Sequence, residues 1–99
     1  MFLDYVGQLH TTKLSLTTTA QLLASDKVIS RQLLGRHAVE INNTGAGIVY
    51  IGGSTVTSDT GLPIAAGASK IIPVNDDSSK NLYIVAGAAQ DIILAEYFA

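Results

Sequence analysis

The sequence predicts an all-β fold in a single domain. Thr, Val and Ile together occupy 26 of the 99 positions, and these β-branched side chains fit a pleated sheet better than a helix. Short apolar segments are separated by Gly-containing turns at intervals of about 8–12 residues, which is typical of a sandwich or barrel. A chain of this length buries one thin core, so neither a second domain nor a deep substrate cleft is expected.

The clearest strand signal lies at residues 37–42, where Val39 and Ile41 alternate with Glu40 and Asn42. Residues 43–47 contain two glycines, and the apolar run 48–51 follows them. This order predicts a hairpin with a loop of about five residues.

The second half of the chain repeats this alternation of strand and turn, and no helix is needed after residue 38. Further strands are predicted at residues 55–57, 62–64, 69–74, 82–85 and 91–97. Pro63 cannot donate a hydrogen bond to a neighbouring strand, so segment 62–64 should lie at a sheet edge or a bend. Turns are expected at residues 66–68 and 86–90, and a polar loop at residues 75–80.

The first 36 residues leave alternatives open. Residues 13–17 alternate like a strand, whereas residues 19–24 fit either a helical turn behind a Thr cap or a continued strand. Residues 1–12 form either an N-terminal arm or the first strand, and the sandwich domain is assigned to residues 13–99. The apolar side chains of the N-terminal segment are candidates for a subunit interface: Phe2, Leu3, Tyr5, Val6 and Leu9.

The composition favours a protein that works within an assembly. Charged residues make up 14% of the chain and hydrophobic residues 47%, which leaves few charges to cover an isolated surface. The net charge of −2 and the scattered basic residues argue against nucleic-acid binding. Without cysteine there is no disulfide, thiolate metal site or cysteine nucleophile. The sequence shows neither an apolar run of membrane-spanning length nor a signal peptide, so no membrane association is expected.

One tripeptide suggests an enzyme. Asp59-Thr60-Gly61 matches the motif that supplies one carboxylate per subunit in homodimeric aspartic proteases, whose two aspartates share a proton. In that family an apolar strand precedes the motif, whereas Thr57 and Ser58 precede it here. A plain turn is therefore the preferred interpretation, and the protein is expected not to be an enzyme.

Other candidate sites are weaker, and neither a cofactor nor a metal is expected. Asp76 and Asp77 offer oxygen ligands, but the further acids and the glycine of a helix-flanked calcium loop are missing. His10 and His37 lie 27 residues apart and have no second ligand at a metal-binding spacing. The Gly-rich segments 45–47 and 67–70 lack the spacing of a phosphate-binding loop. A carbohydrate-binding sandwich is a further alternative, which the absence of Trp disfavours.

From residue 36 onward the chain resembles small virion structural proteins of tailed bacteriophages. These share an apolar strand ending in Asn, a Tyr-Ile-Gly-Gly strand end, Val-Thr, a Gly-x-Pro step, an Ala-Gly turn and a final strand of Leu-Glu-Tyr type. The corresponding segments here are residues 36–43, 48–54, 56–57, 61–64, 66–67 and 95–98. The resemblance covers about two thirds of the chain.

The resemblance implies a single-domain antiparallel β-sandwich, jelly-roll-like, with about seven to nine short strands. It further implies a capsid decoration or cement protein that bridges major capsid subunits on the virion surface after synthesis in the host cytoplasm. A tail, neck, baseplate or fibre component is the alternative. The implied partners are the major capsid protein and further copies of this chain, for example in a trimer, and Phe2, Leu3, Tyr5, Val6 and Leu9 are the candidate contacts.

Overall fold

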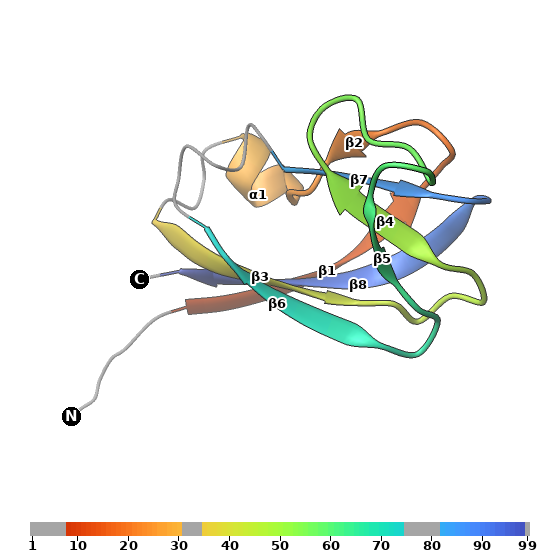
Figure 1. The fold of residues 1–99 in the computed structure, drawn as a ribbon. Helices are drawn as coiled ribbons and strands as arrows, with labels where there is room; N and C mark the ends of the chain where they lie inside the picture. The colour runs from red at the N-terminus through yellow and green to blue at the C-terminus, as the bar shows by residue number, and fades with distance from the viewer. Residues whose placement is uncertain (1–7, 31–34, 75–81, 99) are drawn as a thin grey trace.

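The structure is a computed structural model that describes residues 8–30, 35–74 and 82–98. In these ranges the chain forms eight strands and one short helix (Figure 1). The strands are β1 (Gln8–Leu16), β2 (Gln21–Leu22), β3 (Arg36–Asn42), β4 (Val49–Gly52), β5 (Leu62–Ile64), β6 (Ser69–Pro73), β7 (Tyr83–Ala86) and β8 (Gln90–Phe98), and the helix is α1 (Asp26–Ile29). This part of the chain contains no helix that is long and apolar enough to cross a membrane.

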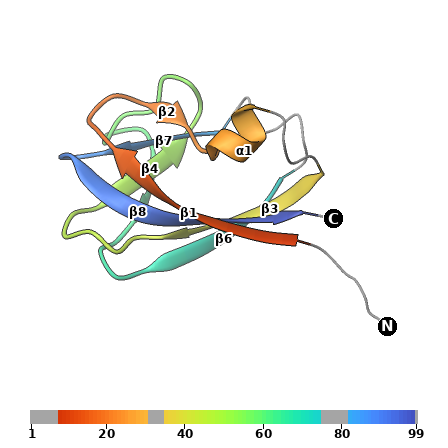
Figure 2. The same ribbon diagram turned by 180° about the vertical axis from the view of Figure 1, so that it is seen from behind.

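The strands form two antiparallel sheets that face each other, as both views show (Figures 1 and 2). Sheet A has the order β1-β8-β3-β6, and sheet B has the order β2-β7-β4-β5. This is the eight-stranded order of a jelly roll, in which two Greek keys are folded into one sandwich. The predicted fold class, an antiparallel jelly-roll-like sandwich of seven to nine strands, is therefore confirmed.

The core fills the space between the two sheets. Alternate residues of the central strands point inward, so that Val39 and Ile41 of β3 and Ile92 and Leu94 of β8 are completely buried. Sheet B contributes the remaining layer of the core through Val49, Ile51, Ile64, Ile84 and Ala86. The two-residue period that predicted the strand at 37–42 thus reflects burial against the opposite sheet.

The predicted hairpin at residues 37–51 is wrong. β3 lies in sheet A and pairs with β6 and β8, whereas β4 lies in sheet B and pairs with β5 and β7. Residues 43–47 therefore carry the chain from one sheet to the other. A local pattern of strand, turn and strand is the same for a hairpin and for such a crossing, and only long-range pairing distinguishes them.

Three other segments test predictions that were made from local sequence patterns. Residues 55–57 were expected to form a strand, but they lie in the loop between β4 and β5, where Val56 is buried. The expectation for Pro63 is confirmed, because β5 is an edge strand of sheet B. Residues 21–22 pair with β7, so the strand alternative holds for part of segment 19–24.

The N-terminal part of the chain joins sheet A at Gln8. β1 pairs with β8 along its whole length, from Gln8 opposite Phe98 to Leu16 opposite Gln90. The boundary between residues 12 and 13 falls inside this strand, so residues 8–12 belong to the sandwich. Residues 1–7 and the predicted loop at 75–80 lie outside the described residues.

Candidate functional site

The outer face of sheet A is the main candidate surface. It is built from the residues that alternate with the buried ones on β1, β8, β3 and β6. Its apolar members are Leu9, Ala38, Ile71, Pro73 and Ile93, together with the ring of Tyr97. Ala95 faces the same way but is 5% exposed, so it adds almost no surface. Leu9 is 57% exposed and Ile71 is 61% exposed. The structure thus places large apolar side chains on a face that points away from the core.

The charges of this face are engaged with other groups of the same face. The Tyr97 hydroxyl donates a hydrogen bond of 2.8 Å to Oε1 of Glu40. Lys13 Nζ lies 3.9 Å from Oδ2 of Asp91, in an exposed ion pair between β1 and β8. The outer face of sheet A therefore presents a strip with little free charge, which suits contact with another protein surface.

The outer face of sheet B is different because a loop covers part of it. The connection between β4 and β5 arches over this side of the sandwich (Figure 1). Val56 in this loop is 6% exposed, and Val85 of β7 is 3% exposed although its neighbours Ile84 and Ala86 point into the core. Figures 1 and 2 show no described element on the corresponding side of sheet A.

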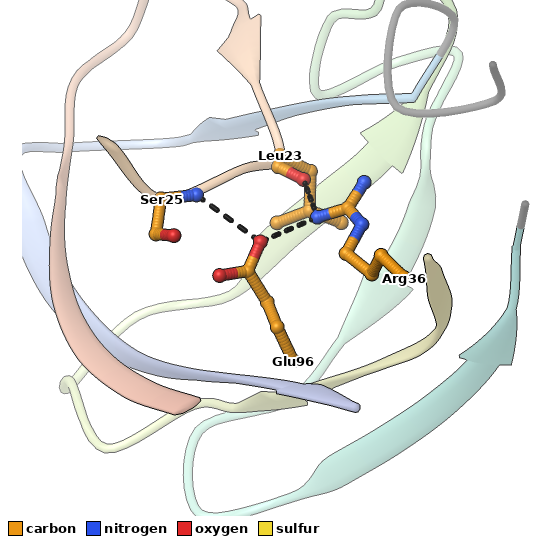
Figure 3. A network of polar contacts seen from close by, with 4 residues as sticks. All are labelled: Leu23, Ser25, Arg36 and Glu96. Carbon is orange, nitrogen blue, oxygen red and sulfur yellow. Dashed lines mark hydrogen bonds and ion pairs between the residues drawn. The ribbon is translucent and has the colours of Figure 1, made fainter. Parts of the chain in front are cut away.

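A buried ion pair lies inside the sandwich, near the end where β8 finishes (Figure 3). Arg36 Nη1 donates to Oε2 of Glu96 at 2.6 Å and to the carbonyl oxygen of Leu23 at 2.9 Å. The backbone N–H of Ser25 donates to the same Glu96 oxygen at 3.2 Å. Arg36 and Glu96 are 1% and 0% exposed, so this pair joins both central strands of sheet A to the segment that precedes α1.

A β-bulge positions Arg36 for this contact. The register between β3 and β8 shifts between Arg36 and Ala38, so Arg36 pairs with Phe98 and Ala38 with Tyr97. Arg36 and Val39 are three positions apart and would lie on opposite faces of a regular strand. The extra residue, His37, is exposed, and Arg36 is turned into the core.

The structure separates the residues that the sequence singled out for chemistry. His37 is exposed at the bulge, whereas His10 is half-buried and lies opposite Glu96 in the register of β1 and β8. Asp59 lies in an exposed turn, where its N–H donates to Oγ1 of Thr57. Within the described ranges no three His, Asp or Glu side chains gather as metal ligands.

One of the predicted contact residues lies within the described residues, and two residues of the site were not predicted. Leu9 lies on the outer face of sheet A, whereas Phe2, Leu3, Tyr5 and Val6, like Asp76 and Asp77, lie outside the described residues. Arg36 and Glu96 were not predicted from the sequence as site residues. Glu96 lies in an apolar strand, between Leu94 and Phe98 on the inward side. A charged residue at an inward position of a strand indicates a buried charge, and this pattern could have identified Glu96.

The comparisons with known proteins identify no family. No family model matches the chain, and no curated protein matches it. Among solved structures, one similar chain is described by the words "Bacillus endospore appendages form a novel family of disulfide-linked pili". The two chains are 15% identical with a TM-score of 0.48, and the alignment covers 95% of this chain and 87% of that one. A likeness at this level does not identify a function.

Proposed function

We propose that this chain is a structural protein of a tailed-bacteriophage virion that decorates the capsid and stabilises it by bridging major capsid subunits. The observation that carries the proposal is the open, weakly charged outer face of sheet A, with Leu9 and Ile71 more than half exposed. The resemblance of residues 36–98 to small virion proteins supports the same role.

The physical basis of this role is the burial of apolar surface. A cement protein stabilises a shell by removing apolar area from water across a seam, which contributes about 25 cal/mol per Å² before ordering costs. Such binding requires no reactive group. The outer face of sheet A suits it because its exposed apolar residues come from the two edge strands, β1 and β6, and the central strand β8 adds the half-buried Ile93.

Two matched charge substitutions test this face. Ile71→Glu places a carboxylate on the outer face of sheet A, and Leu62→Glu places one on β5 of sheet B, where Leu62 is 62% exposed. We expect Ile71→Glu to weaken binding to empty heads of the encoding phage at least about tenfold in co-sedimentation, because the new carboxylate must be desolvated in the contact. Leu62→Glu should bind like the wild type.

The same assay separates the head from the tail. Wild-type protein that binds purified tails and ignores heads would favour the neck, tail or baseplate alternative. Equal binding of both variants to heads would exclude the outer face of sheet A as the contact. Leu62→Glu should keep its free energy of unfolding within about 0.5 kcal/mol, since it lies on the surface. Ile71→Glu lies opposite Glu40 of β3, so repulsion between the two carboxylates should lower its free energy of unfolding by up to about 1 kcal/mol.

A further inference from the structure

The free strand edges of the two sheets are protected unequally. In the part of the chain that the structure describes, the edge strands of sheet B are β2, with two residues, and β5, with three residues including Pro63. In sheet A, β6 has five residues and ends in Pro73. The remaining edge strand, β1, has nine residues, no proline and one charged side chain.

An unprotected edge strand offers a template for pairing. Its outward N–H and C=O groups lack strand partners, and natural proteins usually shorten such strands, place proline in them or add charge. The one charge of β1 does not guard the edge, because Lys13 Nζ lies 3.9 Å from Asp91 on the neighbouring inner strand. Its ammonium group is thus drawn over the outer face of sheet A and away from the open side.

We infer that β1 pairs with β1 of a second copy of this chain, in antiparallel orientation about a two-fold axis at Thr12. Thr12 is the middle residue of Gln8–Leu16, so this register pairs all nine residues. Lys13 then lies opposite Thr11 of the second copy, and Leu9 lies opposite Ser15. A two-fold axis at Lys13 would instead pair the two Lys13 residues with each other, and like charges at directly opposite positions are unfavourable.

The pairing joins the two copies of sheet A into one continuous sheet. A two-fold contact uses the same surface on both subunits, so one self-complementary strand is sufficient. The outer faces of both copies of sheet A then lie side by side and form a single, larger apolar surface. This inference goes beyond the proposed function, because pairing through β1 needs no capsid contact, and it names a strand for the self-association that the resemblance implies.

A cysteine cross-link tests the register. The chain contains no cysteine, so Thr12→Cys introduces one thiol per subunit. Directly opposite residues have Cα atoms about 4.5–5.5 Å apart, within the range of about 4.4–6.8 Å that a disulfide needs. Ser15→Cys is the control, because the two Ser15 residues would be offset by six positions, or about 20 Å.

Mild oxidation of purified protein should convert most of the Thr12→Cys variant into a covalent dimer on a denaturing gel and leave Ser15→Cys monomeric. Absence of the dimer in Thr12→Cys, or equal dimer in both variants, would overturn the inference. Binding to phage heads is scored separately. Head binding without the cross-link would leave the proposed function standing and remove only the β1 contact.

A charge pair provides a second test that does not depend on thiol chemistry. Thr11 is exposed on the outer face, so glutamate or lysine fits there without disturbing the core. Thr11→Glu faces Lys13 of the second copy and should lower the dimer dissociation constant several-fold, whereas Thr11→Lys should raise it by a similar factor. Light scattering over a range of concentrations measures both. A wild type that is monomeric at every concentration, or two variants with the same constant, would contradict the pairing.

Discussion

Glu96 shows how one residue can stabilise a local connection at a cost to the core. It lies on the inward side of β8, and its Oε2 atom accepts hydrogen bonds from Arg36 and from the N–H of Ser25. Its Oε1 atom is buried and accepts no hydrogen bond from the described residues. Burying two charges costs about as much as their attraction returns, so the net contribution of such a pair to stability is small. Removing only one of the two partners is strongly destabilising, because it leaves the other charge buried and unpaired.

Arg36→Met is expected to destabilise the protein by about 3–5 kcal/mol, because it leaves the Glu96 carboxylate buried without its cation. The double variant Arg36→Met with Glu96→Leu should recover part of this loss. The recovery is incomplete, because in the double variant the carbonyl of Leu23 still lacks the Arg36 donor and the N–H of Ser25 also loses the Glu96 acceptor. Denaturant unfolding of the two single variants and the double variant measures the coupling. A double variant as unstable as the sum of the singles would show that the two side chains do not interact.

Tyr97, on the outer face of sheet A, makes the stability of the protein depend on pH in the alkaline range. Its hydrogen bond to Glu40 raises the pKa of Tyr97 above the ordinary value near 10, and desolvation and the Glu40 charge act in the same direction. The folded state therefore favours the neutral phenol. The contribution of Tyr97 to stability is therefore present below the pKa of tyrosine in the unfolded chain. It is lost as pH rises through the pKa of Tyr97 in the folded chain.

The Tyr97→Phe variant should lose this alkaline dependence. We expect the denaturation midpoint of the wild type to fall more steeply than that of the variant above about pH 10. Denaturant titrations of both proteins at several pH values between about 8 and 11 provide the comparison. Parallel curves would show that Tyr97 ionises equally easily in the folded and unfolded chains.

At the scale of single elements, the connection between β4 and β5 depends on close packing around Gly61, its last residue. A Cβ atom on Gly61 would lie 2.6 Å from the Tyr50 Cβ and 2.8 Å from the Val56 Cγ2. It would also lie 3.2 Å from the carbonyl oxygen of Thr57, which accepts a hydrogen bond from the Gly61 N–H. Neither a Cβ nor a backbone atom can move aside without shifting the loop.

Gly61→Ala is therefore expected to destabilise the protein by about 1–3 kcal/mol through overpacking. Gly53→Ala, in the same connection, is the matched control because a Cβ there would have no heavy atom within 4 Å. The control should change the free energy of unfolding by less than about 1 kcal/mol. Thermal and denaturant unfolding of both variants measure the difference. A control as damaging as Gly61→Ala would point to backbone conformation as the cause, and close contact would no longer explain the effect.

The whole molecule is asymmetric, since one outer face carries a loop and the other is open. The open face of sheet A has few charges, and these contact one another. Contacts made by this surface should therefore depend on apolar burial more than on attraction between charges.

Salt dependence tests this property. Raising the ionic strength from about 0.1 M to about 1 M shortens the screening length from about 10 Å to about 3 Å. We expect self-association and head binding by the wild type to change less than about threefold over this range, because neither backbone pairing through β1 nor apolar burial relies on long-range charge attraction. Light scattering and co-sedimentation at both salt concentrations give the measurement. Weakening by more than tenfold would show that attraction between charges dominates the contact.

The sequence by itself determined the class of fold and most strand positions, because both follow from local properties. Alternation of apolar and polar residues around Val39 and Ile41 requires one buried face, and Pro63 is restricted to an edge by its missing N–H group. These constraints hold whichever strands become neighbours.

Only the tertiary structure decided which strands pair, and with that the location of the candidate surface. β3 and β4 follow each other along the chain but belong to different sheets, and the bulge that turns Arg36 toward Glu96 joins residues 60 positions apart. The apolar face of sheet A likewise combines Leu9 near the start of the chain with Ile71 and Tyr97. Such contacts depend on how distant segments share one core, and local residue patterns do not carry that information.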